Sequence, residues 1–245
     1  MKNSPYKYFI LTIVLIAIDQ SIKLWMHNNP FNTSSAELRI IGDWFKLHYV
    51  LNEGMAFGMK LDFIPGGYGK MVLTIFRIFA MFGIGWYLVK LARDGANKGL
   101  LWCIAAILGG AIGNVIDSTF YGVYLGNAPV GSPTPWFHGQ VIDMFYIDPW
   151  QGFLPEWLPF WGGTYYSNPI FNFADASIFC GVVIILFNQN KFFQEANNSQ
   201  MLNNEQLTID NEQLAIDNEG QAETLLPANT DNPVSDIENT PTSQI

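Results

Sequence analysis

Charge is scarce in this sequence. Only 13% of the 245 residues are Asp, Glu, Lys or Arg, against about 25% in ordinary globular chains. Hydrophobic residues make up 49% of the chain. A chain of this length could hold two soluble domains, but this composition argues against that arrangement.

Basic residues are absent from two long stretches. Residues 118–171 contain no Lys or Arg, and residues 192–245 contain ten acidic residues and no basic one. Residues 1–191 therefore hold all 12 basic residues against 21 − 10 = 11 acidic ones, a net charge of +1. The overall charge of -9 comes from the tail. Because no basic stripe exists, nucleic acid is not an expected partner.

Cysteine and histidine are also rare. Cys103 and Cys180 both lie in apolar segments, where they are expected to be small buried hydrophobic residues without a disulfide between them. The three histidines are scattered, and no Cys/His spacing typical of a metal site occurs. We expect no metal and no cofactor.

Four long apolar runs remain, at about residues 6–26, 71–89, 99–117 and 172–188. They predict an all-α membrane protein with four transmembrane helices. The first run is followed by no small-x-small cleavage site, so we expect it to be retained. Residues 44–51 alternate apolar and polar, which predicts a strand, and residues 140–148 indicate a strand or short interfacial helix. The fold class thus includes a small extracytoplasmic β element and a long outer loop, 118–171, whose aromatic residues suit the lipid headgroup region.

The distribution of Lys and Arg predicts the orientation. Six of the 12 basic residues lie on one side of the spans, against four on the other, where the long 118–171 loop has none. This asymmetry predicts that both termini lie in the cytoplasm. Residues 1–191 are expected to form the membrane domain. Residues 192–245 repeat a short polar segment without coiled-coil spacing, which predicts an acidic cytoplasmic tail that is disordered.

Two Asn-x-x-Asp motifs lie at neighbouring span ends. Asn114 and Asp117 close the third span, and Asn172 and Asp175 open the fourth. Consecutive spans cross in opposite directions, so both motifs are expected at the outer face. Two interpretations stay open: the aspartates cap helix ends, or they form a functional pair, as ionisable residues in membrane segments often do.

Paired carboxylates in a low-dielectric site share a proton and titrate as a unit. Such a pair can activate water for hydrolysis, and no Ser-His or Cys-His set competes on the outer face. A second hypothesis is a small proton-coupled carrier that uses the same aspartates as a relay. Asp19 and Lys23, four residues apart in the first span, are expected to form an ion pair that either neutralises its own charges or supports the site.

Five motifs in order resemble the lipoprotein signal peptidase (signal peptidase II) family across residues 8–187. They are Asp19-Gln-x-x-Lys23, Asn52-x-Gly54-x-Ala-Phe57, Gly109-Gly-Ala-x-Gly-Asn114-x-x-Asp117, Val141-x-Asp143 and Phe171-Asn172-x-Ala174-Asp175. The resemblance implies an aspartyl endopeptidase of the bacterial inner membrane, with no metal or other cofactor. Its substrates would be diacylglyceryl-modified prolipoproteins, cut before the lipidated cysteine.

By the same resemblance, Asp117 and Asp175 would be the catalytic pair. The implied substrate-binding or supporting residues are Asp19, Lys23, Asn52, Gly54, Asn114, Asp143, Asn172 and Ala174. Membrane lipids are expected partners, and a monomer is the expected state. The chain departs from the family pattern at Ser118, where Arg is usual, and in the length of its 118–171 loop.

Overall fold

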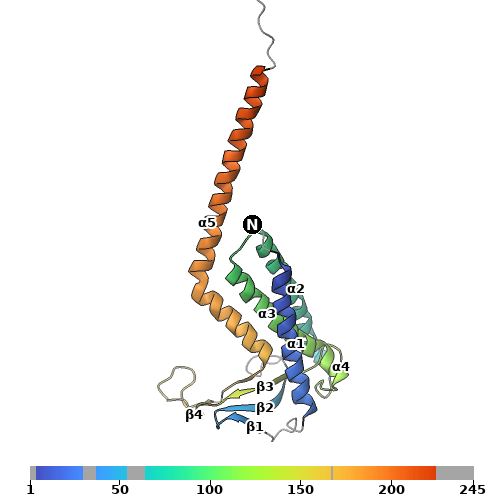
Figure 1. Cartoon of the computed structure of the whole chain (residues 1–245). Helices are drawn as coiled ribbons and strands as arrows, with labels where there is room; N and C mark the ends of the chain where they lie inside the picture. Colours follow the sequence, from blue (N-terminus) through green and yellow to red (C-terminus); the bar gives the residue numbers. More distant parts are fainter. Residues whose placement is uncertain (1–3, 30–36, 54–63, 167, 225–245) are drawn as a thin grey trace, which may run out of the picture. The chain divides into compact units, whose positions relative to one another are not determined.

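The computed structural model describes residues 4–29, 37–53, 64–166 and 168–224. The chain divides into two units, Met1–Asn197 and Asn198–Ile245. The first unit contains the helices and sheets that form the site (Figure 1). Gly54 lies outside the described residues, as does most of the motif that contains it.

Four helices are long and apolar enough to cross a membrane, as the sequence predicts. The helix α1 is Tyr6–Asn28, α2 is Gly69–Arg93 and α3 is Lys98–Ile116. The fourth span is Phe173–Phe192, the first part of α5 (Phe173–Thr224). Two short helical turns accompany them: a 3₁₀ turn, η3 (Pro65–Gly67), precedes α2, and a π-helical turn, η4 (Asp117–Tyr121), links α3 to α4 (Gly122–Tyr124).

Most of the buried apolar side chains of the bundle come from α1, α2 and α3. Tyr8, Leu88, Leu101 and Ala105 form one cluster. The helices α1 and α3 also share a polar contact, because the Thr12 hydroxyl donates to the Ala105 carbonyl at 3.0 Å. The long apolar runs thus produce helices whose buried side faces other helices and whose remaining surface is apolar, as a bilayer requires.

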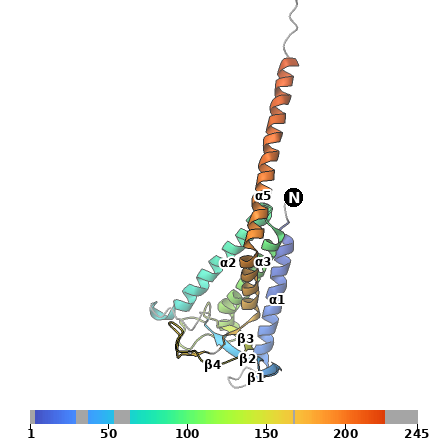
Figure 2. The same ribbon diagram turned by 90° about the vertical axis from the view of Figure 1, so that its left-hand side faces the viewer.

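A four-stranded antiparallel sheet covers one end of the bundle (Figures 1 and 2). Its strand order is β1 (Glu37–Ile41), β2 (Phe45–Asn52), β3 (Val141–Ile147) and β6 (Ile170–Phe171). The strand prediction for 44–51 is confirmed, and 140–148 forms β3. A second cluster, which includes Met26, Leu47, Tyr121 and Ile142, joins this sheet to α1 and η4.

The outer loop also contains a small hairpin. The strands β4 (Gly152–Phe153) and β5 (Tyr165–Tyr166) pair antiparallel and form a sheet of their own.

The helix α5 runs through the expected start of the tail at residue 192 and ends at Thr224. Between Gly181 and Gly220 the chain has neither Gly nor Pro, the two residues that most disfavour a helix. The boundary at 191/192 stays a prediction; Phe192 is buried in the bundle core, and the first compact unit ends at Asn197.

Candidate active site

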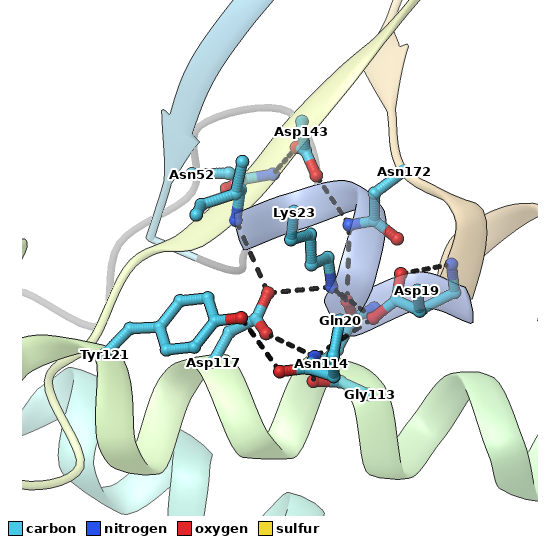
Figure 3. A network of polar contacts seen from close by, with 12 residues as sticks. Asp19, Gln20, Lys23, Asn52, Gly113, Asn114, Asp117, Tyr121, Asp143 and Asn172 are labelled. Carbon is cyan, nitrogen blue, oxygen red and sulfur yellow. Dashed lines mark hydrogen bonds and ion pairs between the residues drawn. The ribbon is translucent and has the colours of Figure 1, made fainter. Parts of the chain in front are cut away.

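Polar side chains converge where the sheet meets one end of the helix bundle (Figure 3). They come from the second half of α1, the end of α3, the strands β2 and β3, and the residues around the start of α5. The members drawn together in the network are Asp19, Gln20, Lys23, Asn52, Gly113, Asn114, Asp117, Tyr121, Asp143 and Asn172.

Lys23 lies at the base of this network and is fully buried. Its ammonium contacts Asp19 at 2.8 Å and Asp117 at 2.7 Å, and it donates to the Asn114 side-chain oxygen at 3.0 Å. The predicted Asp19–Lys23 ion pair is therefore present, with Asp117 as its third member. Three acceptors match the three donors of an ammonium group, so the buried charge is fully hydrogen-bonded.

Asp117 accepts hydrogen bonds from donors on α1 and β3. Besides Lys23, its carboxylate accepts from the Gln20 amide at 2.9 Å and from the Ile142 backbone N–H at 3.4 Å. The side chain is 0% exposed. The Tyr121 hydroxyl donates to the Gln20 side-chain oxygen at 2.8 Å and fixes the amide that contacts Asp117.

Two asparagine amides carry the network towards α5. The Asn114 side chain donates to Asp175 at 2.8 Å, and the Asn172 side chain donates to Asn114 at 3.2 Å. Asn172 also donates to Asp143 at 2.7 Å and accepts from the Asp175 backbone N–H at 2.9 Å. Because the Asn114 oxygen faces Lys23, its NH₂ group is turned towards Asp175.

Among the described residues, Asp143 accepts hydrogen bonds from two side-chain amides. Asn52 donates to one oxygen at 2.9 Å and Asn172 to the other at 2.7 Å. Burial raises the pKa of Asp143 to about 6; the Asn52 hydrogen bond lowers it, and the negative charge of Asp175 raises it. A carboxyl group in this state exchanges its proton near neutral pH.

Asp175 is the most accessible of the four site aspartates. It is half-buried, whereas Asp19, Asp117 and Asp143 are buried. Its carboxylate accepts from Asn114 and, at 3.4 Å, from the Asn172 backbone N–H. Both Asn-x-x-Asp motifs meet at one site, as expected, but the described contacts of Asp117 are with Lys23, Gln20 and Ile142 and do not include Asp175.

Ala174, another residue predicted from the sequence, contributes its backbone N–H. The Ala174 N–H donates to Asp19 at 2.9 Å and fixes the first turn of α5. Sequence reasoning assigned no role to Gln20 or Tyr121. Gln20 could have been found, since it stands beside Asp19 in the first motif, but no local pattern distinguishes Tyr121 from other aromatic residues of the outer loop.

Comparison with known proteins gives a family. A family model described as signal peptidase (SPase) II matches residues 11–191. The chain belongs to the signal peptidase II family. A lipoprotein signal peptidase of Amoebophilus asiaticus is 44% identical over 197 residues, covering 80% of this chain and 82% of the relative. One of Porphyromonas gingivalis is 38% identical over 188 residues, covering 72% and 79%.

The fold agrees with this membership. A solved structure titled "Bacterial membrane enzyme structure by the in meso method at 1.9 A resolution" superposes with a TM-score of 0.53 at 21% identity. That alignment covers 77% of this chain and 95% of the other. Signal peptidase II enzymes are aspartic proteases and membrane proteins of bacteria, so the resemblance seen in the sequence is confirmed. The proton-coupled carrier is not supported.

Proposed function

We propose that this protein removes the signal peptide of diacylglyceryl-modified prolipoproteins, cutting before the lipidated cysteine. The family and its lipoprotein signal peptidase relatives support this activity. The enzyme resides in the bacterial inner membrane with both termini in the cytoplasm. Its site lies near the outer face, where a precursor that has crossed the membrane presents its cleavage point.

The reacting pair in this proposal is Asp143 with Asp175, a revision of the pair inferred from the sequence. One observation carries the revision: Asn172 touches both carboxylates, through its side chain at 2.7 Å and its backbone N–H at 3.4 Å. The described contacts of Asp117 are instead with an ammonium group, an amide and a backbone N–H, and they do not include Asp175.

The pair divides the acid and base roles by environment. Asp143, with its pKa raised to about 6, retains a proton more readily and acts as the acid. Asp175, half-buried and supported by the Asn114 amide, is the base.

In the first step, Asp175 takes a proton from water as the water oxygen bonds to the scissile carbonyl carbon. Asp143 donates its proton to the carbonyl oxygen. In the second step the C–N bond breaks as the peptide nitrogen takes a proton from Asp175. The carbonyl forms again as the remaining hydroxyl of the intermediate returns a proton to Asp143, which leaves a signal peptide with a free carboxyl group and a lipidated N-terminal cysteine.

Lys23 and Asp117 are positioning residues in this account. Lys23 orients the Asn114 amide, and that amide holds Asp175. Asp19 holds the Ala174 N–H at the first turn of α5. The active geometry thus depends on a buried charge cluster that does not touch the substrate.

A cleavage assay tests the function directly. The full-length protein in phospholipid vesicles is given a diacylglyceryl prolipoprotein and, in parallel, the same precursor without lipid. We expect cleavage of the lipidated precursor only, and no cleavage by Asp143→Asn or Asp175→Asn, although both variants remain folded because an amide replaces the carboxylate at the same size. Full activity in either variant contradicts the pair, and equal cleavage of both precursors contradicts the substrate.

A further inference from the structure

The hairpin formed by β4 and β5 presents its aromatic rings outward. Phe160 at its tip is 96% exposed and Trp157 is 78% exposed. Trp150, Phe153, Trp161, Tyr165 and Tyr166 are exposed as well. Soluble surfaces rarely present so many large aromatic rings in one short segment, and the active site uses none of them.

The backbone of the hairpin satisfies its own hydrogen bonds. Leu154 donates to the Thr164 carbonyl at 2.9 Å and accepts from Gly163 at 3.0 Å. Within the tip, Leu158 donates to Pro155 at 3.1 Å and accepts from Gly162 at 2.9 Å. Unpaired peptide groups are what exclude irregular backbone from lipid. This tip has internal partners for several of the groups that would otherwise oppose insertion.

Its charge also suits a shallow position in lipid. Between Trp150 and Tyr166 the only charged residue is Glu156. The backbone of Phe160 has a φ of 72°, in the left-handed region that non-glycine residues rarely adopt, and its ring is exposed.

The hairpin is tied to the part of the chain that enters the membrane. The Gln151 side chain bridges the hairpin to the main sheet, because it accepts from the Tyr165 hydroxyl at 3.0 Å and donates to Asp148 at 2.6 Å. Tyr166 precedes the start of α5 at Phe173 by seven residues, a reach of at most about 25 Å. Both views place the hairpin at the sheet end of the bundle (Figures 1 and 2).

We propose that the β4–β5 hairpin is a membrane anchor whose aromatic tip inserts into the headgroup region of the outer leaflet. Trp and Tyr favour that region, and the neighbouring spans already face lipid. Because the hairpin has no Lys or Arg, its insertion needs no anionic lipid and persists at high salt, unlike a polybasic anchor. The inference does not depend on the peptidase chemistry.

Site-directed spin labelling tests this anchor. In a full-length background with Cys103→Ala and Cys180→Ala, a nitroxide is attached at Trp157→Cys in phosphatidylcholine vesicles. Phe179→Cys, on the exposed face of α5, is the lipid reference, and Asp43→Cys, at an exposed charged turn, is the aqueous reference. Collision rates with oxygen and with a water-soluble nickel chelate give the depth of each label.

We expect the label at residue 157 to meet oxygen readily and nickel severalfold less than the label at residue 43, at low and high salt alike. Adding Phe160→Ser and Trp161→Ser should raise its nickel collision rate towards the aqueous reference. Nickel access equal to that at residue 43 in the parent hairpin would overturn the anchor. Shielding from both reagents would also overturn it, since that result indicates a protein partner in place of lipid.

Discussion

The site aspartates differ in what donates to them. Asp117 receives an ammonium group, whereas the donors to Asp143 in the described part of the chain are the amides of Asn52 and Asn172. The buried ion pair fixes Asp117 against α1 and β3, whereas the Asn172 residue links Asp143 to Asp175. The first residue is therefore suited to fixing structure and the second to exchanging a proton.

Asn52→Ala tests the acid role of Asp143. The Asn52 amide stabilises the charged carboxylate, so its loss raises the pKa of Asp143 above about 6. The acid then remains protonated to higher pH, and the alkaline limb of kcat/KM should move upward. Cleavage is measured across pH, with Asn188→Ala as the matched control, because the Asn188 amide donates within its own helix to the Ile184 carbonyl. An alkaline limb that does not move in Asn52→Ala contradicts the assignment.

The sequence led to Asp117 because it repeats the Asn-x-x-Asp spacing at two span ends. Spacing along a helix reports which side chains share a face, but it does not report which carboxylate a distant lysine occupies. The amide partners of Asp143 lie 91 and 29 residues away in sequence. Only the fold brings Asn52 and Asn172 together, so the sequence could name Asp143 as a supporting residue but could not suggest the acid role that we propose for it.

At the scale of elements, small residues set the approach of α3 to α5. A side chain at Gly110 would overlap the Ala174 carbonyl, and one at Gly113 would lie 2.6 Å from an Asp19 oxygen. Asp19 and Ala174 are themselves hydrogen-bonded. The close contact between these helices therefore places the first turn of α5, and with it Asp175.

Gly110→Ala should separate α3 from α5. Overpacking of this kind costs about 1–3 kcal/mol of stability. Because the first turn of α5 is displaced, we expect the cleavage rate to fall even at temperatures where the variant stays folded. Gly83→Ala in α2 is the control, because nothing lies within 4 Å of the added methyl group. Thermal unfolding in detergent and cleavage rate are measured for both. Equal behaviour of the two variants would show that the contact does not position the site.

The spans and the two long strands were predictable because each depends on a local pattern of apolar residues. The π-helical turn η4 was not. It depends on segments of the outer loop, since Phe137 donates to the Thr119 carbonyl at 3.2 Å and Gly139 to the Ser118 carbonyl at 3.0 Å. These are tertiary contacts without a sequence period, and the two-residue strands β4 and β5 are too short to show one.

At the scale of the whole molecule, catalysis is expected to need only the first unit. Truncation after Asn197 removes the second unit and should leave cleavage unchanged. Truncation after Lys191 also removes Phe192 from the bundle core, and loss of a buried Phe side chain costs about 3–5 kcal/mol. That shorter protein should unfold at lower temperature. Loss of cleavage by a stable 1–197 protein would contradict the division.

The central claim is that Asp117 positions the site and Asp143 reacts. Asp117→Asn alone removes one of the buried charges that pair with Lys23. Removing one partner of a buried ion pair destabilises a protein by about 3–5 kcal/mol. The double variant Lys23→Met with Asp117→Asn avoids this imbalance. The Asp19, Lys23 and Asp117 charges sum to −1 before the change (−1 + 1 − 1), and Asp19 alone leaves −1 after it.

Cleavage of the lipidated precursor by this double variant, compared with Asp143→Asn in the same vesicles, is the most direct test. We predict that the double variant retains measurable cleavage and that Asp143→Asn has none. A folded double variant without cleavage, beside an active Asp143→Asn, would return Asp117 to the catalytic pair and contradict this account.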